Sequence, residues 1–291
     1  MFKGAITALI TPFNNGEIDE KSLAKIIEWQ ISEGINGFVP VGTTGESPTL
    51  NHEEHGRVVK LTIDVTKGRV PVIAGAGSNS TSEAVEMAKF AQQAGADGVL
   101  CVSPYYNKPS QEGLFQHFST IANAISIPLI LYNIPPRSIV DISVETMSRL
   151  RTSCPNIIGV KDATGDLGRV SLQRIALGED FNQISGEDMT ALAYNANGGH
   201  GCISVISNIA PKLFSQLQAT SLSGDFKTAL EIQDKLTPLM QTLFTEPSPA
   251  GVKYVASKLG LCSTELRLPM VQLTKPTEKL LDAAMEHAGI A

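Results

Sequence analysis

The stretch "IPLILYNIPPRSIVDISVETMSRLRTSCPNIIGVKDA", residues 127–163, holds two short apolar runs with a helix-length segment between them. The runs are "IPLILYNIP" (127–135) and "IIGVKDA" (157–163), and both are apolar on consecutive positions rather than on alternate ones. That pattern is typical of parallel strands covered on both faces. The stretch therefore predicts one strand–helix–strand unit of a parallel α/β fold.

The same unit recurs along the whole chain. Eight predicted strands alternate with seven helical segments, and this number in 291 residues favours a (β/α)8 (TIM) barrel. A doubly wound open sheet shares the alternation, but it commonly has a G-x-G-x-x-G turn after its first strand, and "GAGSNS" (75–80) lacks the final glycine. The other six predicted strands are 4–11, 37–42, 70–77, 98–104, 182–188 and 201–207.

The residues after the eighth strand are more than one closing helix needs. We expect a barrel domain over residues 1–224 and a helical C-terminal extension over residues 225–291. No Gly/Ser-rich or Pro-rich linker separates them, so we expect the extension to pack on the barrel. Its predicted helices are 225–244, 250–260 and 276–289.

The composition excludes several classes of function. The chain is 42% hydrophobic and 18% charged with a net charge of −6, and it has no basic stripe, so nucleic acid is not an expected partner. No apolar stretch is long enough for a membrane span, and no export signal is present. Its four cysteines lack C-x-x-C spacing, which argues against a zinc site and suits a reducing compartment. We expect a cytoplasmic protein.

Lys161 stands near the carboxyl end of the predicted sixth strand, where a barrel places its catalytic groups. A snorkelling lysine is the ordinary explanation, but Asp162 is a poor ion-pair partner because adjacent strand residues point to opposite faces. Burial lowers the pKa of a lysine and leaves a neutral amine that can attack a carbonyl. The position therefore favours a Schiff-base lysine.

Other strand ends carry groups that suit the same chemistry. "VGTTGES" (41–47) offers two hydroxyls and backbone N–H groups for a small carboxylate, and "SPYYNKP" (103–109) carries paired tyrosines. "LYNIPPR" (131–137) adds Tyr132, which can transfer a proton, and Arg137, which can bind a carboxylate bidentately. Each feature alone has an ordinary structural explanation, but together they converge on one barrel mouth.

"GTTGES", "SPYYNKP", "LYNIPPR" and "GVKDATGD" together resemble the dihydrodipicolinate synthase family, within the N-acetylneuraminate lyase or class I pyruvate-dependent aldolase superfamily. The resemblance runs from "GAITALITPF" to "LRLPMV", which is nearly the whole chain. Arg137 favours this family over N-acetylneuraminate lyases, which lack the arginine. The resemblance implies a barrel enzyme of lysine and diaminopimelate biosynthesis.

The resemblance also implies a reaction and its catalytic residues. Lys161 matches the lysine that condenses with pyruvate, and the resulting enamine attacks L-aspartate 4-semialdehyde to give 4-hydroxy-tetrahydrodipicolinate. Tyr132 matches the proton-transferring tyrosine, with Thr44 and Tyr106 as its relay partners. Thr43 and Thr44 would hold the pyruvate carboxylate. No metal and no organic cofactor is expected.

Further positions follow from the same resemblance. Arg137 matches the arginine that receives the carboxylate of the aldehyde, and Gly186 and Ile203 match backbone positions that line the site. Tyr105 matches a residue of the tight dimer interface, and Tyr106 is expected to enter the neighbouring subunit's site. The resemblance implies a homotetramer, assembled as a dimer of dimers.

A second, allosteric site is implied, where L-lysine binds and inhibits. The chain departs from the common family pattern at Pro48, Glu187 and Ser248, and none of these positions belongs to the Schiff-base residues. Residues that match the lysine site are Ser47, His52, His55, Asn79, Glu83 and Tyr105.

Two other functions remain open at the level of the residues. A related aldolase acting on keto-deoxy sugar acids or N-acetylneuraminate would use the same lysine. A non-catalytic barrel that binds a keto acid or an amino acid would be expected to lack the reactive residues, which are present here. A phosphate-binding barrel would need a glycine-rich loop after strand seven or eight, but "NGGHG" (197–201) precedes strand eight.

Overall fold

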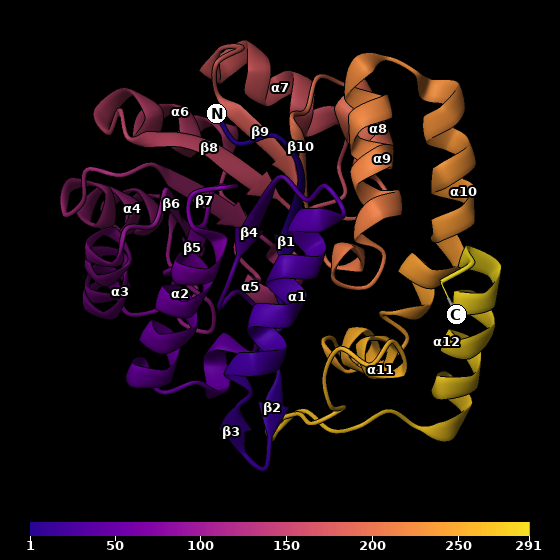
Figure 1. The fold of residues 1–291 in the computed structure, drawn as a ribbon. Helices are drawn as coiled ribbons and strands as arrows, with labels where there is room; N and C mark the ends of the chain where they lie inside the picture. The colour runs from indigo at the N-terminus through magenta and orange to yellow at the C-terminus, as the bar shows by residue number, and fades with distance from the viewer. Residues whose placement is uncertain (291) are drawn as a thin grey trace.

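The computed structural model describes residues 1–290 and contains a single parallel eight-stranded sheet closed into a barrel (Figure 1). The strand order is β4-β1-β10-β9-β8-β7-β6-β5, and a parallel bridge between Phe38 and Val72 joins the two ends. The (β/α)8 prediction is confirmed. The strands are β1 (Gly4–Ala8), β4 (Gly37–Val39), β5 (Ile73–Gly75), β6 (Gly98–Val102), β7 (Leu129–Asn133), β8 (Ile157–Asp162), β9 (Asn182–Ser185) and β10 (Gly201–Ser204).

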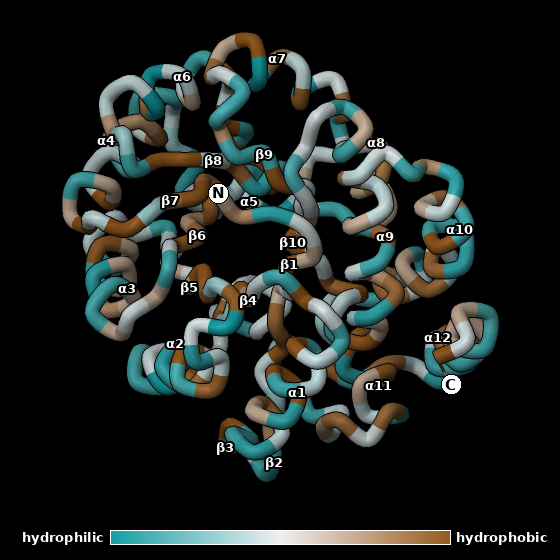
Figure 2. The backbone as a smooth tube through the Cα atoms, turned by 45° about the horizontal axis from the view of Figure 1, so that its top comes forward, coloured by the Kyte–Doolittle hydropathy of each residue, from teal (hydrophilic) through white to brown (hydrophobic). Residues whose placement is uncertain are grey.

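Helices surround the ring of strands, as the end-on view of Figure 2 shows. In α1, Leu23, Ile26 and Ile27 are fully buried, while the side chain of Asp19 accepts a hydrogen bond from the Ser22 N–H and caps the helix. The surrounding helices are α1 (Glu20–Ser32), α2 (His52–Thr66), α3 (Thr81–Ala94), α4 (Gln111–Asn123), α6 (Val144–Ser153), α7 (Gly168–Leu177), α8 (Ala191–Ala196) and α9 (Pro211–Ser223).

The core has two layers, and this explains why the strands are apolar on both faces. One layer lies between the strands and the helices, and the other fills the inside of the barrel. Each strand therefore loses contact with water on both sides. The inner layer consists of Phe2, Ile6, Ala8, Val39, Ile73, Leu100, Ile130, Tyr132, Ile184 and Ile203.

Three helices follow the barrel, as expected: α10 (Phe226–Thr242), α11 (Ala250–Lys258) and α12 (Lys275–Ala288). α10 packs against α9 and α12, on the right of Figure 1. The division of the chain into domains at residues 224 and 225 stays a prediction. No helix within residues 1–290 has the length and apolarity needed to cross a membrane.

A small hairpin of β2 (Phe13–Asn14) and β3 (Glu17–Ile18) was not predicted. The segment between α11 and α12 runs past it, and the Ser263 hydroxyl donates a hydrogen bond to the Phe13 carbonyl at 2.6 Å. Strands of two residues carry no period that a sequence pattern could reveal. The hairpin thus depends on the C-terminal segment that it touches.

Candidate functional site

Lys161 lies on β8 directly beside Tyr132 of β7, because the parallel register of the two strands pairs these residues. The Lys161 side chain is 7% exposed, and its Nζ lies 4.2 Å from the centroid of the Tyr132 ring. Among residues 1–290 no carboxylate lies within ion-pair distance of this amine, and the neighbouring Asp162 pairs with Arg169 instead. The barrel therefore holds an unpaired lysine against a buried tyrosine.

Gly186, at the end of β9, leaves the space that the Lys161 side chain occupies. A Cβ atom at position 186 would lie 3.1 Å from Cε of Lys161 and 2.7 Å from Cβ of Ala163. The Gly186 N–H donates a hydrogen bond to the Asp162 carbonyl at 2.7 Å, and Ile203, on β10, is 1% exposed in the inner core. The two predicted backbone positions thus lie in the barrel interior, with Gly186 directly beside the lysine.

The loop of residues 42–47 follows β4 and carries the two threonines. The Glu46 N–H donates to the Thr43 carbonyl at 3.1 Å, and the Ser47 N–H donates to the Gly42 carbonyl at 3.3 Å, so the loop turns back on itself. Thr44 is 6% exposed and Thr43 is half-buried. The loop is therefore an ordered turn rather than a flexible connection.

A cavity of about 350 Å³ connects this loop with the end of β7. Thr43, Tyr132 and Arg137 line it, and Arg137 extends from the short helix α5 (Pro135–Ser138) with an exposed side chain. Five of the six residues predicted for the lysine site line the same cavity: Ser47, His52, His55, Glu83 and Tyr105. The cavity thus joins most of the predicted lysine site to Thr43, Tyr132 and Arg137, whereas Lys161 and Thr44 do not line it.

On the predicted lysine-binding side, Glu83 is the central acid. Its carboxylate lies 3.1 Å from Nε2 of His52 and accepts a hydrogen bond from the Ser78 hydroxyl. Burial lowers the pKa of His55 to about 4. Sequence analysis missed Ser78, which lines the cavity, whereas Asn79 does not line it and accepts a hydrogen bond from Asn107 on its backbone carbonyl.

Tyr106 is the one predicted catalytic residue that is exposed. It is 90% exposed, has a positive φ of 70° and does not line the cavity. A positive φ is uncommon for a bulky residue and needs support from its surroundings. The single chain does not bring Tyr106 to Lys161.

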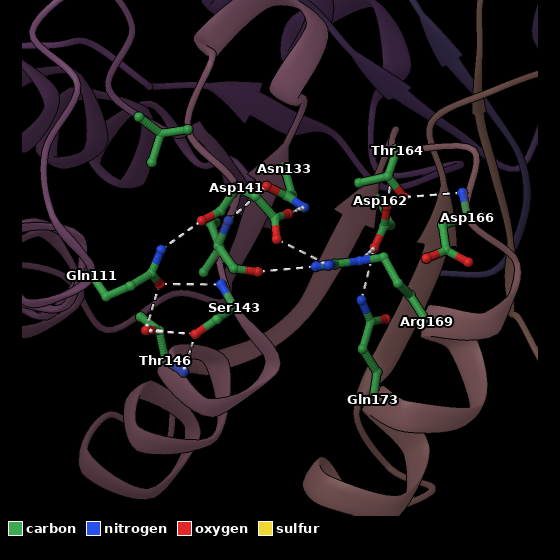
Figure 3. Close-up of polar contacts among 12 residues, drawn as sticks. Gln111, Asn133, Asp141, Ser143, Thr146, Asp162, Thr164, Asp166, Arg169 and Gln173 are labelled. Atoms are coloured by element: carbon green, nitrogen blue, oxygen red, sulfur yellow. Dashed lines mark hydrogen bonds and ion pairs between the residues drawn. The ribbon is translucent and has the colours of Figure 1, made fainter.

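Behind the barrel wall, a polar network that sequence analysis missed connects the ends of β7 and β8 (Figure 3). The Arg169 guanidinium donates hydrogen bonds to Asp162 at 3.0 Å, to Asp141 at 3.1 Å and to the Ile142 carbonyl at 2.9 Å. Asn133 in turn donates to Asp141 at 2.7 Å. Because Asn133 and Asp162 directly follow Tyr132 and Lys161, the network holds the strand ends that carry these two predicted catalytic residues.

Sequence analysis also missed Lys253, which lies on α11 and is completely buried. Its amine forms an ion pair with Glu46, in the loop that carries Thr43 and Thr44. A lysine inside the apolar run "GVKYVA" was the available signal, and it is the same kind of signal that drew attention to Lys161.

A full-length match to a known family accompanies this geometry. The family model described as the dihydrodipicolinate synthetase family matches residues 1–288. The chain belongs to this family. Within residues 1–290, no group of three or more His, Cys, Asp or Glu residues is arranged to hold a metal ion.

Individual members of the family are similar over their whole length. A 4-hydroxy-tetrahydrodipicolinate synthase from Bartonella henselae is 62% identical over 291 residues, which is 100% of this chain and 99% of the relative. A dihydrodipicolinate synthase from Acinetobacter baumannii, solved in complex with pyruvate, is 45% identical with a TM-score of 0.97, and all of both chains is covered. A lysine-bound family member from Cyanidioschyzon merolae is 36% identical with a TM-score of 0.96, covering 100% of this chain and 99% of that one. The predicted family and enzyme class are confirmed.

Proposed function

We propose that this enzyme condenses pyruvate with L-aspartate 4-semialdehyde to give 4-hydroxy-tetrahydrodipicolinate. The observation that carries the proposal is the unpaired amine of Lys161, held 4.2 Å from the Tyr132 ring centroid inside a barrel. A lysine amine that is not engaged in an ion pair is available to act as a nucleophile toward a carbonyl. The pyruvate complex of the related Acinetobacter baumannii enzyme supports pyruvate as the first substrate.

The reaction begins at the Lys161 amine, which attacks the keto carbon of pyruvate and expels water to form a protonated imine. Loss of a methyl proton turns this imine into an enamine, whose carbon attacks the aldehyde carbon of the second substrate. The amino group of that substrate then adds to the imine carbon, closes the ring and displaces the lysine amine. Tyr132 is the group that transfers protons in these steps, with Thr44 and Tyr106 as its relay.

Substrate carboxylates need fixed donors in this scheme. Thr43 and Thr44 would bind the carboxylate of pyruvate through hydroxyl and backbone N–H groups. Arg137 lines the cavity with an exposed guanidinium, which suits the carboxylate of the aldehyde arriving from solvent. The backbone of Gly186 and Ile203 would line the opposite side.

The test is pyruvate-dependent consumption of L-aspartate 4-semialdehyde by the purified protein, followed through a coupled reductase. We expect a robust rate that is lost in Lys161→Ala. Treatment with pyruvate and borohydride should add one reduced pyruvate adduct to the wild type and none to Lys161→Ala. Adduct formation without turnover would point to another pyruvate-dependent aldolase, and no adduct on folded protein would exclude the Schiff base.

We also propose that L-lysine inhibits the enzyme from the side of the cavity that holds Glu83. The effector's ammonium groups suit the Glu83 carboxylate, which already lies beside His52. Activity should fall as L-lysine is added, and Glu83→Gln should raise the half-inhibiting concentration about tenfold through loss of one charge-assisted hydrogen bond. Glu86→Gln, an exposed change on the same helix, is the control and should inhibit like the wild type. Full activity at saturating lysine would remove the proposal.

We further propose a cytoplasmic homotetramer built as a dimer of dimers. Tyr106 is 90% exposed in the single chain, which suits a residue that completes a neighbouring subunit's site. The four cysteines are unpaired, which suits a reducing compartment. A mass measurement in solution distinguishes the tetramer from a dimer, and a monomer with full activity would contradict the role of Tyr106.

A further inference from the structure

A buried ion pair connects the C-terminal helices to the loop that carries Thr43 and Thr44. Lys253, on α11, is 0% exposed, and its Nζ contacts the Glu46 carboxylate as well as the Glu265 carbonyl at 2.9 Å. The same Nζ lies 4.1 Å from the centroid of the Phe13 ring. The amine is thus fully enclosed by a carboxylate, a carbonyl and an aromatic face.

Both the side chain and the main chain of Glu46 have hydrogen-bonding partners. One carboxylate oxygen forms the ion pair with the Lys253 amine, and the other accepts a hydrogen bond from the Arg267 backbone N–H at 3.1 Å. Its backbone has a left-handed φ of 57° and donates its N–H to the Thr43 carbonyl at 3.1 Å. The side chain is therefore anchored in the C-terminal segment while the main chain is bonded directly to the residue that would bind substrate.

Arg267 strengthens the same anchorage. Its guanidinium forms hydrogen bonds to Glu54 of α2 and to the Thr49 carbonyl, and it stacks 4.5 Å from the Phe13 ring. It therefore fixes the segment that presents its own N–H to Glu46. Through Glu46, the loop of residues 42–47 is thus anchored to residues more than 200 places away in the chain, in addition to the Thr11 hydroxyl, which donates a hydrogen bond to the Gly45 carbonyl at 2.7 Å.

Burying two opposite charges is a costly way to join two segments. Desolvation lowers the pKa of Lys253, and apolar side chains of similar volume commonly stabilise a core as well or better. The ion pair differs from apolar packing in that it fixes the position of one particular carboxylate. In this chain that carboxylate belongs to Glu46, only two residues from Thr44.

We propose that Lys253 is a positioning residue for pyruvate, which acts through Glu46 to hold the hydroxyls of Thr43 and Thr44 at the substrate carboxylate. The proposal rests on the proposed function and deepens it. It also connects the C-terminal extension with the reaction, because Lys253 of α11 would hold the loop of residues 42–47 in position for substrate binding.

The experiment compares Lys253→Met, Glu46→Gln and the double variant that carries both. In the single variants a buried charge loses its partner, so their folding must be checked by thermal unfolding. The double variant removes both charges together and should recover much of the lost stability. Lys258→Met, an exposed ion-pair change on the same helix, is the matched control and should keep wild-type kinetics.

We expect the KM for pyruvate to rise about tenfold in Lys253→Met and in the double variant. The KM for the aldehyde should stay within about twofold, because Arg137 lies on α5 and has no contact with this pair. If the double variant is stable and keeps the wild-type KM for pyruvate, the ion pair only stabilises the fold and the proposal is wrong. Equal changes for both substrates would also overturn it.

Failure of this inference differs from failure of the proposed function. Turnover by the wild type with unchanged variants overturns only the positioning role. If the wild type forms a borohydride-trapped adduct without turnover, the half-saturating pyruvate concentration for trapping replaces KM as the readout. A wild type that does neither overturns the proposed function, and the positioning role fails with it.

Discussion

Two lysines of this chain are buried, and they lie in two different regions of the molecule. Lys161 is at the mouth of the barrel with its Nζ 4.2 Å from the Tyr132 ring, and Lys253 is at the seam with the C-terminal helices, 4.1 Å from the Phe13 ring. Lys253 also has a carboxylate and a carbonyl oxygen, while Lys161 has no ion-pair partner among residues 1–290. The aromatic contact is therefore common to both, and the carboxylate makes the difference.

We expect this difference to separate a structural lysine from a reactive one. A carboxylate beside a buried lysine favours the charged amine, which cannot attack a carbonyl, although desolvation is the larger influence on Lys253 and lowers its pKa. Lys161 has no such partner among residues 1–290, so we expect its amine, and not that of Lys253, to be the nucleophile. Burial alone thus does not identify a nucleophile, because the partner must be known as well.

The largest expected effect is in covalent labelling. With pyruvate and borohydride, Lys161 should be labelled and Lys253 should not, although both are buried beside an aromatic ring. Peptide mapping by mass spectrometry measures the two sites in one sample. A label on Lys253 in the wild type would remove the distinction between the two lysines.

The next largest effect is expected in stability. Here the substitution of Lys253 should have the larger effect, whereas in labelling Lys161 is the residue affected. Lys253→Met should lower the free energy of unfolding by about 3–5 kcal/mol, because it leaves the buried Glu46 carboxylate without its partner. Lys161→Met leaves no such carboxylate behind and should cost less than about 1 kcal/mol. Urea unfolding at pH 7.5 measures both. Similar losses in the two variants would show that the ion pair contributes little.

Tyr132→Phe makes the ring beside Lys161 the same as the ring beside Lys253. The aromatic contact is kept and only the hydroxyl is lost, so kcat should fall about 10²-fold while the fold stays intact. Steady-state kinetics together with circular dichroism test this. A variant with wild-type kcat would mean that another group transfers the proton.

The smallest expected effect is the change in the free energy of unfolding with pH. It determines the pH at which the stabilities of the two lysine variants should be compared. Burial lowers the pKa of His117 to about 4, while a histidine in an unfolded chain titrates near 6.5. Between these values only the unfolded chain takes up the proton, so stability that is present above pH 6.5 is lost as the pH falls toward 4.

His117→Asn should therefore reduce the difference in unfolding free energy between pH 7.5 and pH 5.5 by about 1 kcal/mol. Urea unfolding at the two pH values measures it, and an unchanged difference would assign the pH dependence to other groups. His55, whose pKa is also lowered to about 4, should still contribute its own part.

Local patterns predicted the barrel correctly because each strand is a short apolar run and each helix has an apolar face of helical period. The positions of Tyr132 and Lys161 were also predictable, since parallel strands bring their carboxyl ends to one edge. The hairpin over Phe13–Ile18, the Arg169 network and the Lys253 ion pair were not. The hairpin has strands of only two residues, and the other two features consist of polar side chains whose pairing follows no period, with Lys253 and Glu46 207 residues apart.

The sequence by itself therefore determined the fold, the family and the strand that carries the predicted nucleophile. Its apolar periodicity decides which surfaces leave water, and its motifs place hydroxyls, tyrosines and an amine at strand ends. Only the tertiary structure decided which of the two buried lysines has a carboxylate partner. That outcome depends on where Glu46 lies, and its position depends on contacts across more than 200 residues of chain.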